Sequence, residues 1–300
     1  NDVQVHELLG TALRELGDLE ASKAHLAEAQ RFGPNIDDHG TGGPDKADAG
    51  PQGLSSFLNV DIMPAQRQRD ILHYDERLFT AYDGPALDDL QASRRAATGT
   101  DLATAKRLIE SALRADPDAL QVRYLAGYIR FLDNDMSTAL TLLNGVLTEQ
   151  PRLIGANYMI GEISRQRGEF DRAMGYYNVA VHEAGSMGEA FLGIATVYIT
   201  NNDAARAVKF YEAALASKSD YVAAMGAFAR VLSVHPNPKF RNGQQALKLA
   251  ERACILSAHQ DAWLLDTLAA AYAEAGHYSD AVETANDAID RAEANSQPQL

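Results

Sequence analysis

The sequence of 300 residues lacks features that several common protein classes require. Its single cysteine, Cys254, excludes an internal disulfide framework and a cysteine-based zinc or iron–sulfur site. Lysine and arginine number 27 against 41 acidic residues, and the net charge of −14 disfavours binding to nucleic acid or to an anionic membrane surface. No apolar run approaches the roughly 20 residues of a membrane span. We therefore expect neither nucleic-acid partners nor direct membrane insertion.

Motifs of catalysis and cofactor binding are also missing from the sequence. No His-Glu-x-x-His, Gly-x-Ser-x-Gly, Cys-x-x-Cys or EF-hand spacing occurs. Residues 40–46 (Gly-Thr-Gly-Gly-Pro-Asp-Lys) lack the Gly-Lys-Ser/Thr ending of a phosphate-binding loop, and the calcium alternative fits no known loop frame. Cys254 stands among alanines and leucine on a predicted helix, which is typical of a buried structural thiol. We expect no enzymatic activity, no cofactor and no metal site.

What the chain contains is an internal repeat with a period of 34 residues. Small residues recur at one position of each unit, namely Ser93, Gly127, Gly161, Ala195 and Ala229. Alanine follows twelve positions later, at Ala105, Ala139, Ala173 and Ala207, and a bulky residue four positions after that, at Ile109, Leu143, Tyr177 and Tyr211. Pro117 and Pro151 close two units, because proline forces the preceding residue out of helical geometry. The pattern predicts pairs of amphipathic helices that cross closely at small residues.

This pattern resembles the tetratricopeptide repeat (TPR), a helix–turn–helix unit of about 34 residues. The resemblance implies an all-α fold, a right-handed α-solenoid whose stacked units share one continuous core. We place a first unit at 3–36, five units over 86–260 and a C-terminal unit at 261–295. The last of the five units carries an extended turn at 235–243, where two prolines forbid a continued helix. The first unit departs from the pattern at Ser22, where the repeat prefers alanine.

Residues 37–85 interrupt the period. The stretch 33–53 is rich in glycine, proline and aspartate, and it predicts a solvated loop that buries too little apolar surface to offset ordering. Residues 69–82 differ, because the spacing of their apolar side chains predicts a short amphipathic helix that packs on the solenoid. Two interpretations of the insertion stay open: a tolerated surface insertion, or a functional element.

Family knowledge places positions 2, 5, 9 and 12 of each first helix on the concave groove of such a stack. These positions give an aromatic cluster flanked by charged residues: Tyr124, Tyr128, Phe131, Tyr158, Arg94, Glu162 and Arg165. Tyrosine and arginine dominate interface hot spots, so we predict that this groove binds a partner. The alternative that part of the cluster only packs between helices stays open. The lysine and asparagine with which some TPR proteins grip a C-terminal carboxylate are absent at positions 5 and 9.

The segment 237–276 is similar to the closing repeats of a bacterial group of exported TPR proteins, among them multihaem cytochromes and glycosyltransferase-like membrane proteins. This similarity favours a periplasmic or extracellular setting over the cytoplasm. The chain has no haem-attachment motif, and it begins at Asn1 without methionine, which we interpret as a processed or truncated product. It would then be the repeat module or a partner of such a system.

The sequence therefore favours a non-catalytic protein–protein interaction scaffold that holds a partner peptide or helix in the concave groove. A second hypothesis is self-assembly into a homo-oligomeric fibre or ring, because the first predicted unit begins almost at Asn1 and leaves an apolar edge uncapped. A third hypothesis is an accessory module of an exported multihaem or glycosyltransferase-type system.

Overall fold

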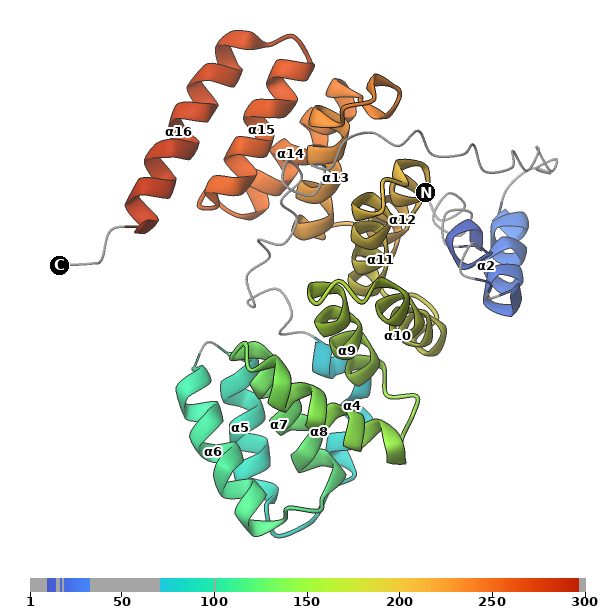
Figure 1. The fold of residues 1–300 in the computed structure, drawn as a ribbon, viewed down its shortest axis with the longest axis vertical. Coiled ribbons are helices and arrows are strands. Elements are labelled where there is room, and N and C mark those ends of the chain that lie inside the picture. The colour runs from blue at the N-terminus through green and yellow to red at the C-terminus, as the bar shows by residue number, and fades with distance from the viewer. Residues whose placement is uncertain (1–9, 15–16, 18, 33–70, 100, 297–300) are drawn as a thin grey trace. The chain divides into compact units, whose positions relative to one another are not determined.

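The computed structural model describes residues 10–14, 17, 19–32, 71–99 and 101–296 (Figure 1). Every regular element within these ranges is a helix, and neighbouring helices pack against each other from α5 to α10 and from α12 to α16. The fold class is all-α, an α-solenoid of helix–turn–helix units, as the 34-residue period predicts. The loop predicted at 33–53 and parts of the first predicted unit lie outside the described residues.

The chain divides into two compact units. The middle unit comprises Met63–Gly193, and the outer unit comprises Asn1–Ile62 with Ile194–Leu300. After a 3-10 turn at 71–75, the middle unit contains α4 (Glu76–Thr80), α5 (Leu87–Thr98), α6 (Leu102–Ala115), α7 (Leu120–Leu132), α8 (Met136–Glu149), α9 (Ile154–Gln166) and α10 (Phe170–Ala184). The division between the units falls within α11 (Gly188–Thr200).

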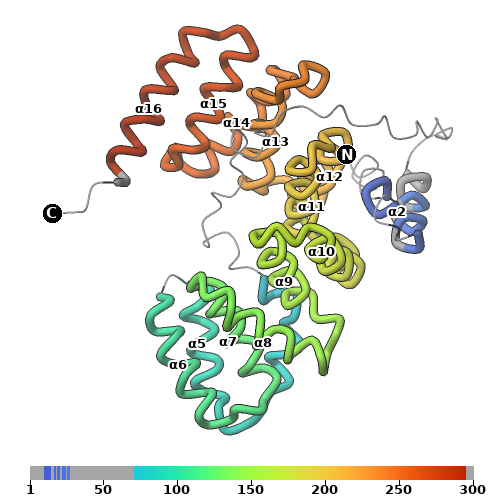
Figure 2. The backbone as a smooth tube through the Cα atoms, viewed as in Figure 1, coloured from blue at the N-terminus to red at the C-terminus, as the bar shows by residue number. Residues whose placement is uncertain are grey.

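The outer unit continues the same succession of helices (Figure 2). It contains α2 (Leu19–Phe32), α12 (Ala204–Ser217), α13 (Val222–Val234), the 3-10 helix η2 (Pro238–Phe240), α14 (Gly243–Leu256), α15 (Ala262–Glu274) and α16 (Tyr278–Ser296). The short helix η2 lies in the extended turn 235–243, and Asn242 N closes that turn by donating to Leu232 O at 2.8 Å. Among the described residues, no helix combines the length and the apolar character that crossing a bilayer requires.

Most of the second helices of the units have a polar N-cap residue. Asp101, Asp135 and Asp203 each accept a hydrogen bond from the backbone amide three residues onward, at 2.9, 3.2 and 3.0 Å. The hydrogen bonds from Thr104 and Thr138 lower the pKa of the Asp101 and Asp135 carboxyls, because they stabilise the charged form. Residues with positive φ make the turns between paired helices, at Asn134, Gly168, Asn202 and Gly276, and asparagine and glycine tolerate this conformation.

The repeated small residues lie where paired helices cross. A Cβ added at Gly127 would lie 2.9 Å from Leu143 Cδ2, which leaves no room for a larger side chain. Ser93 of α5 also lies close to the paired helix α6, and its Oγ donates a hydrogen bond to Ala105 O at 2.8 Å. Ser22 is buried and its Oγ donates to Gly10 O at 2.7 Å, so serine fits where the repeat prefers alanine.

Candidate functional site

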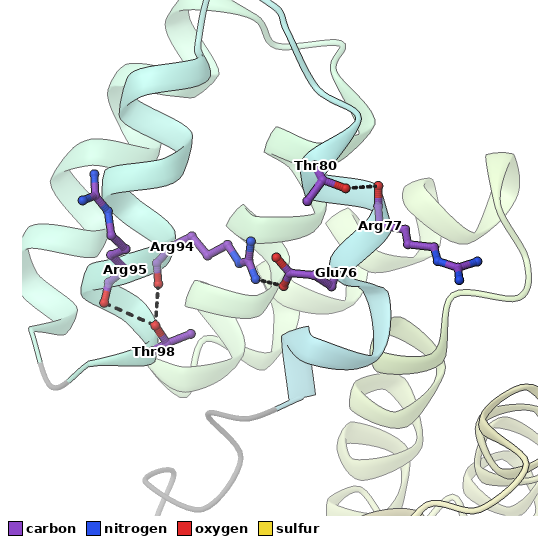
Figure 3. A network of polar contacts seen from close by, with 6 residues as sticks. All are labelled: Glu76, Arg77, Thr80, Arg94, Arg95 and Thr98. Carbon is purple, nitrogen blue, oxygen red and sulfur yellow. Dashed lines mark hydrogen bonds and ion pairs between the residues drawn. The ribbon is translucent and has the colours of Figure 1, made fainter.

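Residues 71–80, the 3-10 turn and α4 together, form a segment that contacts the first helices of successive units. We call it the α4 segment. From α5, Arg94 pairs with Glu76, as Figure 3 shows, and its guanidinium carbon lies 4.7 Å from the centroid of the Phe79 ring. From α7, the ring of Tyr124 stacks on Phe79 with a centroid separation of 5.7 Å. Phe79 is therefore held by an aromatic ring and a cation.

Asp75 is the centre of the polar contacts between the α4 segment and the repeats. Its Oδ2 accepts hydrogen bonds from Tyr124 Oη at 2.6 Å and from Gly155 N at 2.8 Å, and its Oδ1 accepts from Ile154 N at 3.0 Å. The carboxyl thus caps the N-terminus of α9 although Asp75 lies about 80 residues earlier in the chain. Only 7% of Asp75 is exposed, and this burial raises its pKa against the lowering effect of the hydrogen bonds.

The absence of a side chain at Gly155 lets the α4 segment approach α9. A Cβ there would lie 2.8 Å from Ile71 Cγ2 and 3.0 Å from Asp75 Oδ2. Further along, Tyr74 Oη donates to Glu189 Oε2 of α11 at 3.0 Å. The segment therefore reaches from α5 to α11 within the middle unit.

Four contact residues of the repeats hold positions that the family pattern assigns to the concave groove. Arg94 is at position 9 of its unit, Tyr124 at position 5, and Gly155 and Glu189 at position 2. These residues belong to four consecutive units, and all four touch the α4 segment. A stretch of the chain's own insertion thus lies along these positions.

The other predicted groove residues are buried among helices. Tyr128, Phe131 and Tyr158 are 0, 3 and 3% exposed. The ring of Tyr158 lies 6.2 Å from that of Tyr177, centroid to centroid. Packing between helices, the alternative left open by the sequence, therefore describes the present contacts of Tyr158. The role of Tyr128, Phe131 and Tyr158 in binding a partner stays a prediction.

The charged pair of the predicted groove is also largely buried. Glu162 is 6% exposed, accepts a hydrogen bond from Tyr177 Oη and pairs with Arg165 at 3.2 Å. Burial and the nearby Glu162 carboxylate raise the pKa of Tyr177 well above its ordinary value, so Tyr177 stays a hydrogen-bond donor. Arg165 keeps 12% of its side chain exposed, against 25% for Arg94.

No sequence pattern points to Asp75 or to the cleft that it lines. The cleft has a volume of about 590 Å³ and lies between the α4 segment and α7–α9, with His73, Tyr74, Arg77, Gln121, Gln150 and Leu153 in its lining. The apolar spacing within 69–82 predicts a helix there, but no pattern connects Asp75 to the start of α9. That connection depends on the tertiary structure.

A metal site and a reactive cysteine have little support in the described part of the chain. No group of three or more histidine, cysteine, aspartate or glutamate side chains converges there as metal ligands would. Cys254 is buried, and burial raises the pKa of its thiol to about 12, which makes it a poor nucleophile. The best-defined site is the surface around the α4 segment.

Paired helices that cross at small residues and pack in succession define the class of helical-repeat proteins. Family models described as "Tetratricopeptide repeat" match residues 90–153 and 188–221, so the chain contains tetratricopeptide repeats. Proteins of this kind are interaction scaffolds.

Solved structures share this fold at low sequence identity. A tetratricopeptide repeat protein from Parabacteroides merdae is 18% identical with a TM-score of 0.50, over 71% of this chain and 81% of that one. A chain of the APC/C hetero-tetramer Cut9–Hcn1 is 14% identical with a TM-score of 0.55, over 69% of this chain and 43% of that one. No curated protein sequence matches the chain.

Proposed function

We propose that this protein is a non-catalytic scaffold that binds a peptide or helix of a partner protein on the concave face of its repeats. The observation that carries the proposal is the α4 segment, which contacts groove positions of four consecutive units through Arg94, Tyr124, Gly155 and Glu189. A face that holds one short helical segment by polar and aromatic contacts has the chemistry to hold another.

The predicted groove residues divide into two kinds under this proposal. Arg94 and Arg165 keep 25% and 12% of their side chains exposed and would select acidic groups of the partner. The aromatic residues Tyr124, Tyr128, Phe131 and Tyr158 are buried, as is Glu162. Contact of a partner with these aromatic residues requires movement of the α4 segment, at least over Tyr124.

Site-specific photo-crosslinking in native extract tests the groove without removing any packing residue. A photoreactive amino acid at Gln121, at the edge of the cleft, should give a discrete partner adduct, identified by mass spectrometry. The matched control is Thr141, exposed on the second helix of the same unit, which should give no such adduct. Equal adducts at the two sites, or an adduct at Thr141 alone, would reject the groove as the binding face.

Self-assembly is a second candidate, and α16 supplies the observation that favours it. Tyr278, Val282 and Ile289 are 71, 63 and 56% exposed, and their spacing places them on one face of the helix. The acidic residues Glu283, Asp287 and Asp290 of this helix are exposed as well, but they leave this apolar stripe uncovered. A second copy of the chain would bury the stripe in a homo-oligomer.

Sedimentation velocity over a concentration series tests self-assembly. The wild type should gain mass as concentration rises, and a Val282→Ser/Ile289→Ser variant should gain less. The control is Asp287→Ser on the same helix, which leaves the apolar stripe intact. A wild-type protein that stays monomeric throughout would reject this candidate.

A further inference from the structure

We propose that the middle unit selects helices that present a carboxylate to the N-terminus of α9 and an aromatic ring one helical turn later. We further infer that the α4 segment is a built-in competitor, which a partner helix of the same chemistry displaces. This inference rests on the proposed function of the concave face and names the class of its ligand.

The carboxylate preference follows from three donors that converge on Asp75. Tyr124 Oη, Ile154 N and Gly155 N all donate to it, within 2.6 to 3.0 Å. A carboxylate accepts through both oxygens and satisfies all three, whereas an amide would turn an N–H group toward a backbone N–H of α9. The first turn of α9 also carries a partial positive charge that favours an anion. Glutamine or asparagine in a ligand would therefore bind less well.

The aromatic preference follows from the surroundings of Phe79. Its ring lies against Tyr124 at 5.7 Å, and Arg94 covers it at 4.7 Å, while only 5% of the residue is exposed. Phe79 follows Asp75, the N-cap residue of α4, by four positions, so the two side chains lie about one helical turn apart. Ile71 and Leu72, 0 and 1% exposed, anchor the preceding turn. A matching ligand carries apolar residues, then Asp, then an aromatic residue four positions later.

A partner helix can displace the α4 segment because the segment has little stability of its own. The helix α4 has five residues, too few for an isolated helix to persist in water. Its ion pair with Arg94 is partly exposed, with 49% of the Glu76 side chain open to solvent, so the pair adds little. The neighbouring cleft of about 590 Å³ offers a longer helix additional surface. The segment is held in place by the repeats rather than by its own structure.

A synthetic peptide of residues 69–82 with a fluorescent label is the probe, and the receptor is the full chain. Because the attached segment competes at a high effective concentration, the wild-type chain should bind the peptide weakly. An Asp75→Ala/Phe79→Ala chain, whose own segment is weakened while the receptor residues are unchanged, should bind it at least about tenfold more tightly. A peptide carrying Asp75→Asn should bind that chain at least about tenfold more weakly.

Two results would overturn the proposal. The first is a variant chain that keeps its helical circular dichroism yet binds the peptide no better than the wild type. The second is an Asp75→Asn peptide that binds as well as the native peptide. Either failure, together with a partner adduct from Gln121, would leave the scaffold function standing and reject only the acidic-helix ligand.

A second measurement applies if the double variant loses its helical signal. A fluorophore attached to Arg77→Cys reports on the segment in an otherwise native chain, since Arg77 is exposed and points away from the Arg94–Glu76 pair (Figure 3). Cys254 is buried and should not be labelled. Excess peptide should change the emission of this label as the segment leaves the groove. No change at saturating peptide would equally reject displacement.

Discussion

Replacing Gly161 with alanine should destabilise the middle unit, although alanine is the better helix former. A Cβ at residue 161 would lie 2.8 Å from Cδ1 and Cε1 of Tyr177, closer than real Cβ atoms approach. The Tyr177 ring is fully buried, and its hydroxyl group is held by Glu162. It also lies against Gly193, where an added Cβ would be 2.5 Å from its Cζ. The ring therefore has little room to retreat from a methyl group.

The expected magnitude combines two opposing effects. Forcing an extra carbon into a packed core costs about 1–3 kcal/mol, and the helix propensity of alanine over glycine returns about 0.8–1.0 kcal/mol. Gly175 in α10 is the matched control, since it is exposed and an added Cβ would meet no atom within 4 Å. Gly175→Ala should therefore stabilise the protein by up to about 1 kcal/mol. The difference between the two variants isolates the steric cost, about 1–3 kcal/mol.

Urea unfolding followed by helical circular dichroism measures both variants against the wild type. Gly161→Ala should unfold at lower urea than Gly175→Ala, with the wild type between them or close to the first variant. If Gly161→Ala proves as stable as Gly175→Ala, the close approach of α9 to Tyr177 is not what restricts residue 161 to glycine.

Three further predictions concern single residues. Because burial raises its pKa to about 12, the Cys254 thiol should not react with a thiol reagent at about pH 8 until urea unfolds the chain. The raised pKa of Asp75 means that its carboxyl favours folding below about pH 4 and that this contribution is lost as the pH rises through the raised value. The free energy of unfolding in urea, measured from about pH 4 up to neutral pH, should fall more steeply in the wild type than in Asp75→Asn. Asn242→Ala removes the cap on Gln245 N and should cost about 0.5–2 kcal/mol in the same assay.

Each of these predictions has a result that would contradict it. Rapid modification of Cys254 in the folded protein would show that the thiol is accessible. Parallel stability curves for the wild type and Asp75→Asn would show that the Asp75 pKa is not raised. Asn242→Asp keeps an acceptor and should retain most of the stability, so an equal loss in both Asn242 variants would mean that the cap is not the cause.

The helix pairs could be predicted from the sequence because each unit carries small and bulky residues at the same positions. Gly127 and Gly161 recur where helices cross closely, and the bulky residues Leu143 and Tyr177 recur opposite them. Such spacing is local and periodic, so it can be read without a structure. The short helix at 76–80 also follows from the apolar spacing in 69–82.

The surroundings of the candidate site could not be predicted in the same way. The α4 segment stands outside the period, and a sequence does not show where an aperiodic segment packs. Tyr124 at a groove position is typical of an exposed interface residue, yet it is fully buried, stacked on Phe79 and bonded to Asp75. The contact of Asp75 with Gly155 spans 80 residues, and only the folded chain reveals it.

The long reach of the α4 segment has a consequence for how the middle unit folds. Repeat proteins hold mainly contacts between neighbouring units, so they can lose one unit at a time from an end. Here Tyr74 bonds to Glu189 across 115 positions, and Asp75 bonds to Tyr124 across 49. These contacts form only after several units have assembled, which raises the contact order and slows folding. While the segment is bound, its contacts connect four units, so that the middle unit should melt cooperatively as one block, without gradual loss of its terminal helices.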